Sequence, residues 1–138
     1  MSSKLENMLI RHEGLKLKPY RCTAGKLTIG IGRNLDDNGI TEAEARMMLT
    51  YDIEVARSKL LKYEWFTNLN EPRRDAVINM VFNLGMPRFL GFKRTIGYLK
   101  LEDYENAAIE MMNSKWADQV GDRAIELAAI ILTGKYQQ

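Results

Sequence analysis

Residues 16–33 interrupt an otherwise helical pattern, and this interruption constrains the fold more than any other feature of the sequence. Pro19 and three glycines divide the segment into short β-prone pieces, of which residues 28–31 form the clearest strand. The segments before and after it carry apolar residues at helical spacing. The order of helix, small sheet, long helix and helical bundle predicts an α+β fold, in which a small β lobe is joined to a larger helical lobe.

Glycines and capping residues mark the ends of the first helices. The first helix is expected to end near Glu13, with Gly14 as the stop. Thr41 and Glu44 form a capping box that opens a long helix. The residues expected on the buried side of this long helix are Leu49, Ile53, Ala56 and Leu60.

The second half of the chain carries the most regular apolar stripe, which predicts a buried helix. Its members are Ala76, Val77, Met80, Val81 and Leu84. Asn70 is expected to cap this helix and Gly85 to end it. Further helices are expected over residues 92–99, 103–113 and 122–132.

The sequence predicts a single domain built from two lobes. The β lobe is expected over about residues 14–40, with a turn at 36–39, and a connecting helix over about 41–62. The helical lobe is expected over about residues 65–138, together with the N-terminal helix. A cleft between two such lobes is a natural place for a ligand, so the active site is expected there.

Composition and charge argue against several classes of protein. A net charge of +2 without a clustered basic stripe gives no support for binding nucleic acid. One cysteine excludes an internal disulfide, and no ligand spacing suggests a metal, so neither metal nor cofactor is predicted. No apolar run approaches the roughly 20 residues of a membrane span, and the charged N-terminus does not resemble a signal peptide. The protein is therefore expected in the cytoplasm, without stable membrane insertion.

Glu13 is the candidate catalytic acid. Partial burial against apolar residues and the negative end of its helix would both raise the pKa of the carboxyl. The alternative is a solvent-facing glutamate in an ordinary loop, since charged residues are mostly exposed. Cys22 is either a small buried hydrophobe or a partly exposed hairpin thiol. Gly30 and Gly32 either allow the close approach of a ligand or permit a sharp twist.

Taken together, Glu13, Cys22 and Thr28 match the signature of a known family. In that signature a Glu is followed after eight residues by an Asp or Cys, and after five more by a Thr. The chain therefore resembles the phage-type lysozymes of glycoside hydrolase family 24. Further family landmarks recur in order at residues 79–85, 91–92, 107–108, 114–116 and 122–124.

The resemblance implies a muramidase, which hydrolyses the β-1,4 bond between N-acetylmuramic acid and N-acetylglucosamine in peptidoglycan. It makes Glu13 the general acid and Thr28 the residue that positions the attacking water. Cys22 takes the place of the second catalytic acid. A thiol is mostly neutral at pH 7, so it supplies charge only if Arg21 or Lys26 lowers its pKa; alternatively it attacks as a nucleophile with retention. Inversion, usual in the family, needs catalytic groups roughly 6.5–9.5 Å apart.

The resemblance also implies a substrate-binding groove. Its residues by family position are Phe82, Asn83, Thr95 and Glu110. For Phe82 a core position is an equal alternative, and Trp116 is expected to be a core anchor rather than a sugar platform. Arg123 matches a family arginine that supports the cleft by reaching the catalytic glutamate.

Two positions depart from the best-known members of the family. His12 stands where an acid is common, so the support that this acid gives the arginine is lost. Arg33 replaces a commoner histidine and is expected to pair with Asp52 on the long helix.

The biological role implied by the resemblance is that of a phage or prophage endolysin for host lysis. Such a protein acts as a monomer on peptidoglycan and stays in the host cytoplasm until a holin releases it. A tail-associated lysozyme is a second placement. The alternative from another class is an inactive peptidoglycan-binding or structural module with a lysozyme fold, against which the intact Glu13–Thr28 spacing argues.

Overall fold

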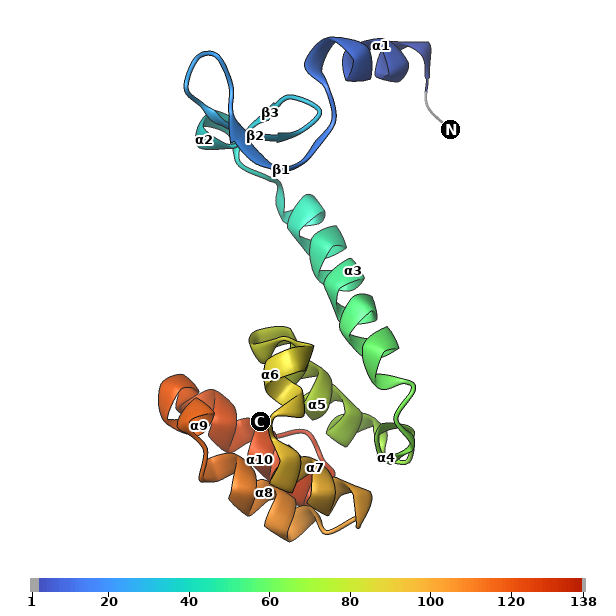
Figure 1. Cartoon of the computed structure of the whole chain (residues 1–138), viewed down its shortest axis with the longest axis vertical. Helices are drawn as coiled ribbons and strands as arrows, with labels where there is room; N and C mark the ends of the chain where they lie inside the picture. The colour runs from blue at the N-terminus through green and yellow to red at the C-terminus, as the bar shows by residue number, and fades with distance from the viewer. Residues whose placement is uncertain (1–2, 138) are drawn as a thin grey trace. The chain divides into compact units, whose positions relative to one another are not determined.

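The computed structural model describes residues 3–137, whose helices and strands follow one another as Figure 1 shows. The chain divides into two compact units, residues 1–48 and residues 49–138. Helix α3 (Glu42–Leu60) contributes residues to both units. Its many helical turns confirm the predicted long helix. The lobe boundaries drawn from the sequence, and the grouping of the N-terminal helix with the helical lobe, stay predictions.

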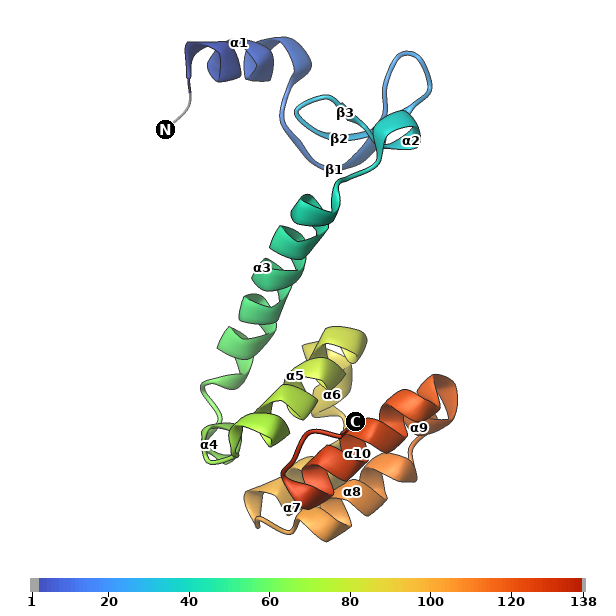
Figure 2. The same ribbon diagram turned by 180° about the vertical axis from the view of Figure 1, so that it is seen from behind.

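The N-terminal unit begins with a helix that is followed by a small sheet, as the sequence predicted, and the sheet has three antiparallel strands. Helix α1 (Lys4–Glu13) ends at Gly14, which has φ 81°. The strands are β1 (Lys16–Arg21), β2 (Leu27–Gly30) and β3 (Arg33–Asn34), and they lie in the order β1-β2-β3 (Figure 2). Because consecutive strands pair, two tight turns are enough to connect the sheet.

Residues 36–39 were expected to form a turn, but the structure places most of them in a short helix, α2 (Leu35–Asn38). Asn34 caps it by accepting a hydrogen bond from the backbone N–H of Asp37 at 3.0 Å. Acidic residues in the first turn of a helix stabilise its N-terminus. The polar cluster that suggested a turn therefore supplies the acidic first turn of a short helix.

The start of α3 confirms the capping box and corrects one pairing. Thr41 Oγ1 accepts from the backbone N–H of Glu44 at 3.1 Å, and Glu44 Oε1 accepts from that of Thr41 at 2.9 Å. Arg33 was expected to pair with Asp52. Its guanidinium instead donates to both carboxylate oxygens of Glu44 at 3.0 and 2.6 Å and to the carbonyl of Gly39 at 3.1 Å. Glu44 lies in the first turn of α3, close in sequence to β3, and its carboxylate therefore reaches Arg33.

The unit of residues 49–138 is a bundle of helices that follow the second half of α3. They are α4 (Glu64–Thr67), α5 (Glu71–Leu84), α6 (Met86–Leu90), α7 (Lys93–Lys100), α8 (Tyr104–Met112), α9 (Lys115–Val120) and α10 (Asp122–Thr133). The sequence predicted α5, α7, α8 and α10. It missed α4, α6 and α9, because helices of four to six residues are too short to display an apolar period.

The hydrophobic core of the bundle is one cluster, to which the end of α3 and each helix from α4 to α10 contribute buried side chains. All five residues of the predicted stripe on α5 are buried, and Asn70 and Gly85 cap its ends as expected. Trp116 is 3% exposed, which confirms its prediction as a core anchor. On α3, Ala56 and Leu60 are buried as expected, whereas Leu49 is 45% exposed.

Candidate active site

Glu13 is the last residue of α1, and its side chain lies on Gly32 in the turn between β2 and β3. A Cβ built at Gly32 would stand 2.6 Å from Oε2 of Glu13, and 3.1 Å from both its Cβ and its Cδ. The chain path explains this contact. Gly14 turns the chain out of α1 into β1, and Lys16 at the start of β1 pairs with Gly30 at the end of β2.

The surroundings of Glu13 differ from the enclosure that the sequence predicted. In the described N-terminal unit its side chain is exposed, so this unit does not supply the predicted partial burial. The contact with Gly32 covers one side of the carboxylate. The close approach allowed by a glycine is therefore that of the chain's own glutamate.

Cys22 and Thr28 meet at the other turn of the sheet, between β1 and β2. The backbone N–H of Cys22 donates to the carbonyl of Lys26 at 3.0 Å, and the N–H of Gly25 donates to the carbonyl of Cys22 at 2.8 Å. Thr28 lies on β2 opposite Tyr20 of β1. Cys22 is partly exposed, which supports its interpretation as a hairpin thiol, while Thr28 is 3% exposed.

The turn lowers the pKa of the Cys22 thiol below its ordinary value. The backbone N–H groups of Lys26 and Ala24 stabilise the thiolate, burial opposes them, and the Thr28 hydroxyl adds a smaller stabilisation. A larger thiolate fraction at neutral pH supplies negative charge where the family commonly has an aspartate. In this turn the Cys22 thiol is therefore more acidic than a thiol exposed to water.

The sequence left open whether the pKa of Cys22 is lowered. Arg21 and Lys26 were the cations expected to act on Cys22. Instead, Arg21 pairs with Asp36 at 3.6 Å and Lys26 with Asp37 at 3.1 Å. Backbone N–H groups in the turn, rather than cationic side chains, lower the pKa of Cys22. The direction of these N–H groups depends on the turn geometry, which residue types in the sequence do not indicate.

The hydroxyl of Thr28 has one proton and two possible acceptors. In the structure it donates to the carbonyl of Lys26 at 2.8 Å. Its lone pairs then remain free to accept a hydrogen bond, for example from a water. If Cys22 becomes a thiolate, the same proton can turn toward the sulfur, so the two residues are chemically linked.

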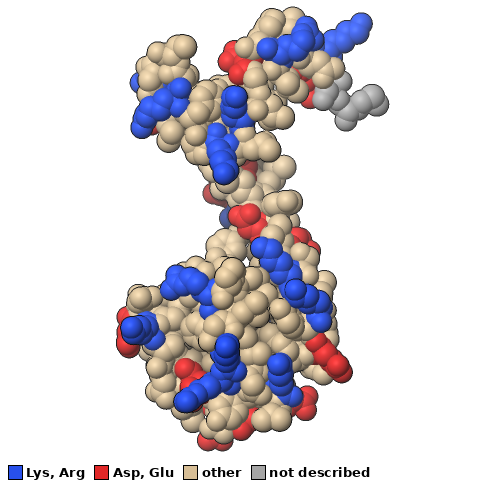
Figure 3. Space-filling model, viewed as in Figure 1, with Lys and Arg blue, Asp and Glu red and all other residues tan. Residues whose placement is uncertain are grey.

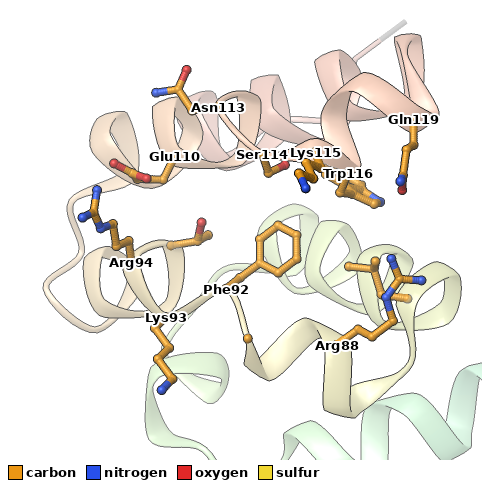
Figure 4. Close-up of a pocket in the computed structure, with 13 residues that line it drawn as sticks. Arg88, Phe92, Lys93, Arg94, Glu110, Asn113, Ser114, Lys115, Trp116 and Gln119 are labelled. Atoms are coloured by element: carbon orange, nitrogen blue, oxygen red, sulfur yellow. The ribbon is translucent and has the colours of Figure 1, made fainter.

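In the bundle, Thr95 and Glu110 line a groove of about 660 Å³ (Figure 4). The groove also carries four cations, namely Arg88, Lys93, Arg94 and Lys115. None of these four forms an ion pair within residues 3–137. In Figure 4 Phe92 lies at the centre of the groove, between Arg94 and Arg88. On the face of the bundle in Figure 3, Lys and Arg side chains spread over the middle while Asp and Glu lie mostly toward its edges.

Asn83 and Phe82 do not line the groove that contains Thr95 and Glu110. Asn83 accepts a hydrogen bond from Nε1 of Trp116 at 2.8 Å, so it holds a groove wall rather than lining the groove. Phe82 is 47% exposed, and the alternative of a core position for it was wrong. It lines a second pocket of about 410 Å³ together with Arg123.

Arg123 is held by a residue that sequence reasoning did not single out. Its Nε donates to Oδ1 of Asn79 at 2.8 Å and Nη2 lies 3.4 Å from the Asn79 carbonyl. Asn79 opens the landmark at residues 79–85, which was the available signal. The bundle thus brings together Thr95 with Glu110, and separately Phe82 with Arg123.

The described residues offer neither a metal-binding cluster nor a membrane-spanning helix. Among residues 3–137 there is no group of three or more His, Cys, Asp or Glu side chains able to hold a metal ion. No helix in the same part of the chain is both long and apolar enough to cross a membrane.

The mostly helical structure with a small antiparallel sheet is the α+β fold of a lysozyme. The chain belongs to the phage lysozyme family, whose profile matches residues 10–129. It is 30% identical to the probable T4-type lysozyme 1 of Dictyostelium discoideum, over 97% of this chain and 96% of that protein. This family supports a glycosidase of the muramidase type that acts on peptidoglycan.

Two phage proteins are also similar. The endolysin of Acyrthosiphon pisum secondary endosymbiont phage 1 is 35% identical, over 80% of this chain and 75% of the endolysin. The pre-baseplate central spike protein Gp5 of Enterobacteria phage T4 is 28% identical, over 96% of this chain but only 28% of the spike protein.

Proposed function

We propose that the chain is an N-acetylmuramidase, which hydrolyses the β-1,4 bond between N-acetylmuramic acid and N-acetylglucosamine, with Glu13 as its general acid. The observation that supports this most is that three residues lie on or against one small sheet. Glu13 lies on the β2–β3 turn, and the Thr28 hydroxyl lies beside the sulfur of Cys22 at the β1–β2 turn. Family membership over residues 10–129 supports the same chemistry.

In this mechanism Glu13 gives its proton to the glycosidic oxygen, so that the leaving sugar departs as an alcohol. The carboxyl must therefore be protonated when substrate is bound. Its side chain is exposed in the unit, so bound sugar has to exclude water from it, which favours the neutral acid over the carboxylate. The proton is recovered from water after each turnover.

Thr28 and Cys22 act on the other reactant. A water that donates a hydrogen bond to Thr28 Oγ1 is held with its lone pairs free to attack the anomeric carbon. In one course the Cys22 thiolate stabilises the oxocarbenium-like transition state and accepts the water proton, which inverts the configuration. In the other the thiolate sulfur bonds to the anomeric carbon and water later displaces it, which retains the configuration. The anomer first released, followed by proton NMR, distinguishes the two.

The groove with Thr95 and Glu110 is proposed to bind part of the peptidoglycan substrate. The peptides of peptidoglycan carry carboxylates, and the four unpaired cations of the groove suit such a ligand. Phe82 and Arg123 are proposed as an aromatic face for sugar and as a support of the site, and Asn83 as an indirect contributor through Trp116. That Arg123 reaches Glu13 remains a prediction.

Lysis of outer-membrane-permeabilised Gram-negative cells by wild type and by Glu13→Gln tests the mechanism. Glu6→Gln is the matched control, since Glu6 is an exposed glutamate on the same helix. We expect Glu13→Gln to lose turbidity clearance by roughly 10²–10⁴-fold, the usual contribution of a general acid, and Glu6→Gln to clear like wild type. Equal clearance by Glu13→Gln would remove the mechanism. Binding to cell walls without lysis by the wild type would support the inactive module.

We propose that the biological role is that of a monomeric endolysin, which waits in the host cytoplasm and is released by a holin. The similarity to a protein named endolysin supports this. The similarity to a spike protein over almost all of this chain favours a tail-associated lysozyme as second candidate. Two experiments separate these candidates. One is expression in bacteria with and without a holin, and the other is mass spectrometry of purified phage particles. Lysis that requires the holin supports the endolysin, and the chain in particles supports the second candidate.

A further inference from the structure

We propose that Gly32 is a positioning residue for catalysis, because it is the surface against which the carboxylate of Glu13 is held. This inference rests on the proposed role of Glu13 as the general acid. The contact lies entirely within the N-terminal unit and joins the end of α1 to the turn between β2 and β3.

The contact involves more than the mobile tip of the glutamate. A methyl group at Gly32 would meet Oε2 at 2.6 Å, and a carboxylate oxygen can swing away from such a clash. It would also meet Cβ and Cδ of Glu13 at 3.1 Å. The Cβ is fixed to the backbone of α1, so a rotamer change relieves only part of the crowding. An added methyl therefore forces the helix end and the turn apart.

A demand for positive φ does not by itself account for this contact. Gly30 and Gly32 both have φ 71° in the same hairpin, a conformation that costs other residues strain. A Cβ at Gly30 would meet nothing within 4 Å, whereas one at Gly32 would meet Glu13. The two glycines share the same positive φ and differ in the crowding, which separates the two effects.

The contact matters for catalysis because the acid and the water-positioning residue come from different elements. Glu13 ends a helix, while Thr28 lies on β2, the strand that leads into the turn with Gly32. Contact between Glu13 and that turn ties the acid to the hairpin that carries Thr28. General acid catalysis depends on the placement of the donor, and small displacements cost large factors in rate.

Kinetics of Gly32→Ala and Gly30→Ala on soluble uncrosslinked peptidoglycan fragments test this inference. We expect both variants to lose thermal stability, because both place alanine at positive φ, and Gly32→Ala to lose more, because only its methyl group crowds Glu13. We expect Gly32→Ala alone to lose at least about tenfold in kcat with little change in KM, as displacement of a catalytic group predicts. Its kcat–pH profile should also shift, since the surroundings of the acid change, whereas that of Gly30→Ala should match wild type.

Equal kcat values and equal pH profiles for the two alanine variants would overturn the inference. Glu13→Gln in the same assay keeps this failure distinct from failure of the proposed function. Full activity of Glu13→Gln removes the general acid itself, whatever the glycine variants do. If Gly32→Ala does not fold, Gly32→Asn and Gly30→Asn replace the pair, because asparagine tolerates positive φ better than alanine.

Discussion

The two units of the molecule differ in the kind of contact that stabilises each of them internally. In the bundle, apolar side chains such as Phe66, Phe89 and Leu60 are at most 1% exposed and form a continuous core. Among residues 3–48, by contrast, Thr28 is the one buried residue. Turns, caps and ion pairs shape this N-terminal unit, which also carries Glu13, Cys22 and Thr28. Stability and the proposed chemistry therefore depend on different parts of the chain.

Polar contacts in the N-terminal unit set geometry more than they set stability. The carboxylate of Asp36 accepts from the backbone N–H of Leu27 at 2.7 Å, and Lys26 pairs with Asp37. Ion pairs as exposed as these contribute little to the free energy of folding. They hold α2 against the β1–β2 turn, and this turn is what lowers the pKa of Cys22.

The largest effect on stability is expected in the bundle. Phe89→Ala should lower the free energy of unfolding by about 3–5 kcal/mol, because Phe89 is fully buried and contacts two other rings, Trp65 and Phe92. Leu101→Ala is the control, since Leu101 is 75% exposed and should change stability by no more than about 0.5 kcal/mol. Denaturant unfolding measures both. A comparable loss for the two variants would contradict a bundle that is stabilised by its buried core.

Substitution of Cys22 should affect activity more than stability. Cys22→Asp should keep most of the lytic rate because it restores a full negative charge, whereas Cys22→Ser should lose at least about tenfold, since serine stays neutral. Turbidity clearance at matched concentrations of folded protein measures both. If serine lyses as well as cysteine, then charge at this turn is not needed. If aspartate fails and cysteine works, the sulfur acts as a nucleophile.

Removal of the Arg33 clamp should have a smaller effect that depends on acid. The bidentate hydrogen bonds from Arg33 lower the pKa of Glu44 to about 2, below the ordinary value of about 4.3. A lowered folded-state pKa stabilises the protein above the ordinary pKa, and this contribution is lost as the pH falls toward 2. Glu44→Gln should therefore melt below wild type at pH 7 and converge with it near pH 2. A constant gap in Tm would contradict this assignment.

The smallest effect on stability is expected for Tyr136 in the bundle, and it depends on alkaline rather than acidic pH. The hydroxyl of Tyr136 donates to Asp75 at 2.5 Å, which raises the pKa of Tyr136 to about 12. A raised folded-state pKa stabilises the protein below the ordinary value of about 10, and this contribution is lost as the pH rises through 12. Tyr136→Phe should melt slightly below wild type at pH 8 and converge with it above pH 12. A gap in Tm that persists at that pH would break the contrast with Glu44.

Patterns that repeat along one element made the fold predictable. The stripe on α5, the capping box at Thr41 and the stop at Gly14 each depend on residues close in sequence, and each was confirmed. The three short helices were missed because they contain too few residues for a period. The partner of Arg33 was wrong because the distance between β3 and α3 depends on the path of α2, which the sequence showed only as a polar cluster.

The candidate site was predictable in its residue types and not in its surroundings. The spacing of Glu13, Cys22 and Thr28 identified the family, and the exposed side chain of Glu13 shows that spacing carries no measure of burial. The backbone N–H groups around Cys22 and the contact of Gly32 with Glu13 depend on turn geometry. Asn79, which holds Arg123, had no signal beyond its place in a family landmark.

The most direct test of the account is the identity of the sugar at the reducing ends that the protein creates. Purified peptidoglycan is digested by wild type and by Glu13→Gln, reduced with borohydride, hydrolysed and examined by mass spectrometry. We expect reduced muramic acid in the wild-type digest and at most a trace with Glu13→Gln. Reduced glucosamine, free peptides without new reducing ends, or equal release by Glu13→Gln would contradict a muramidase that uses Glu13 as its acid.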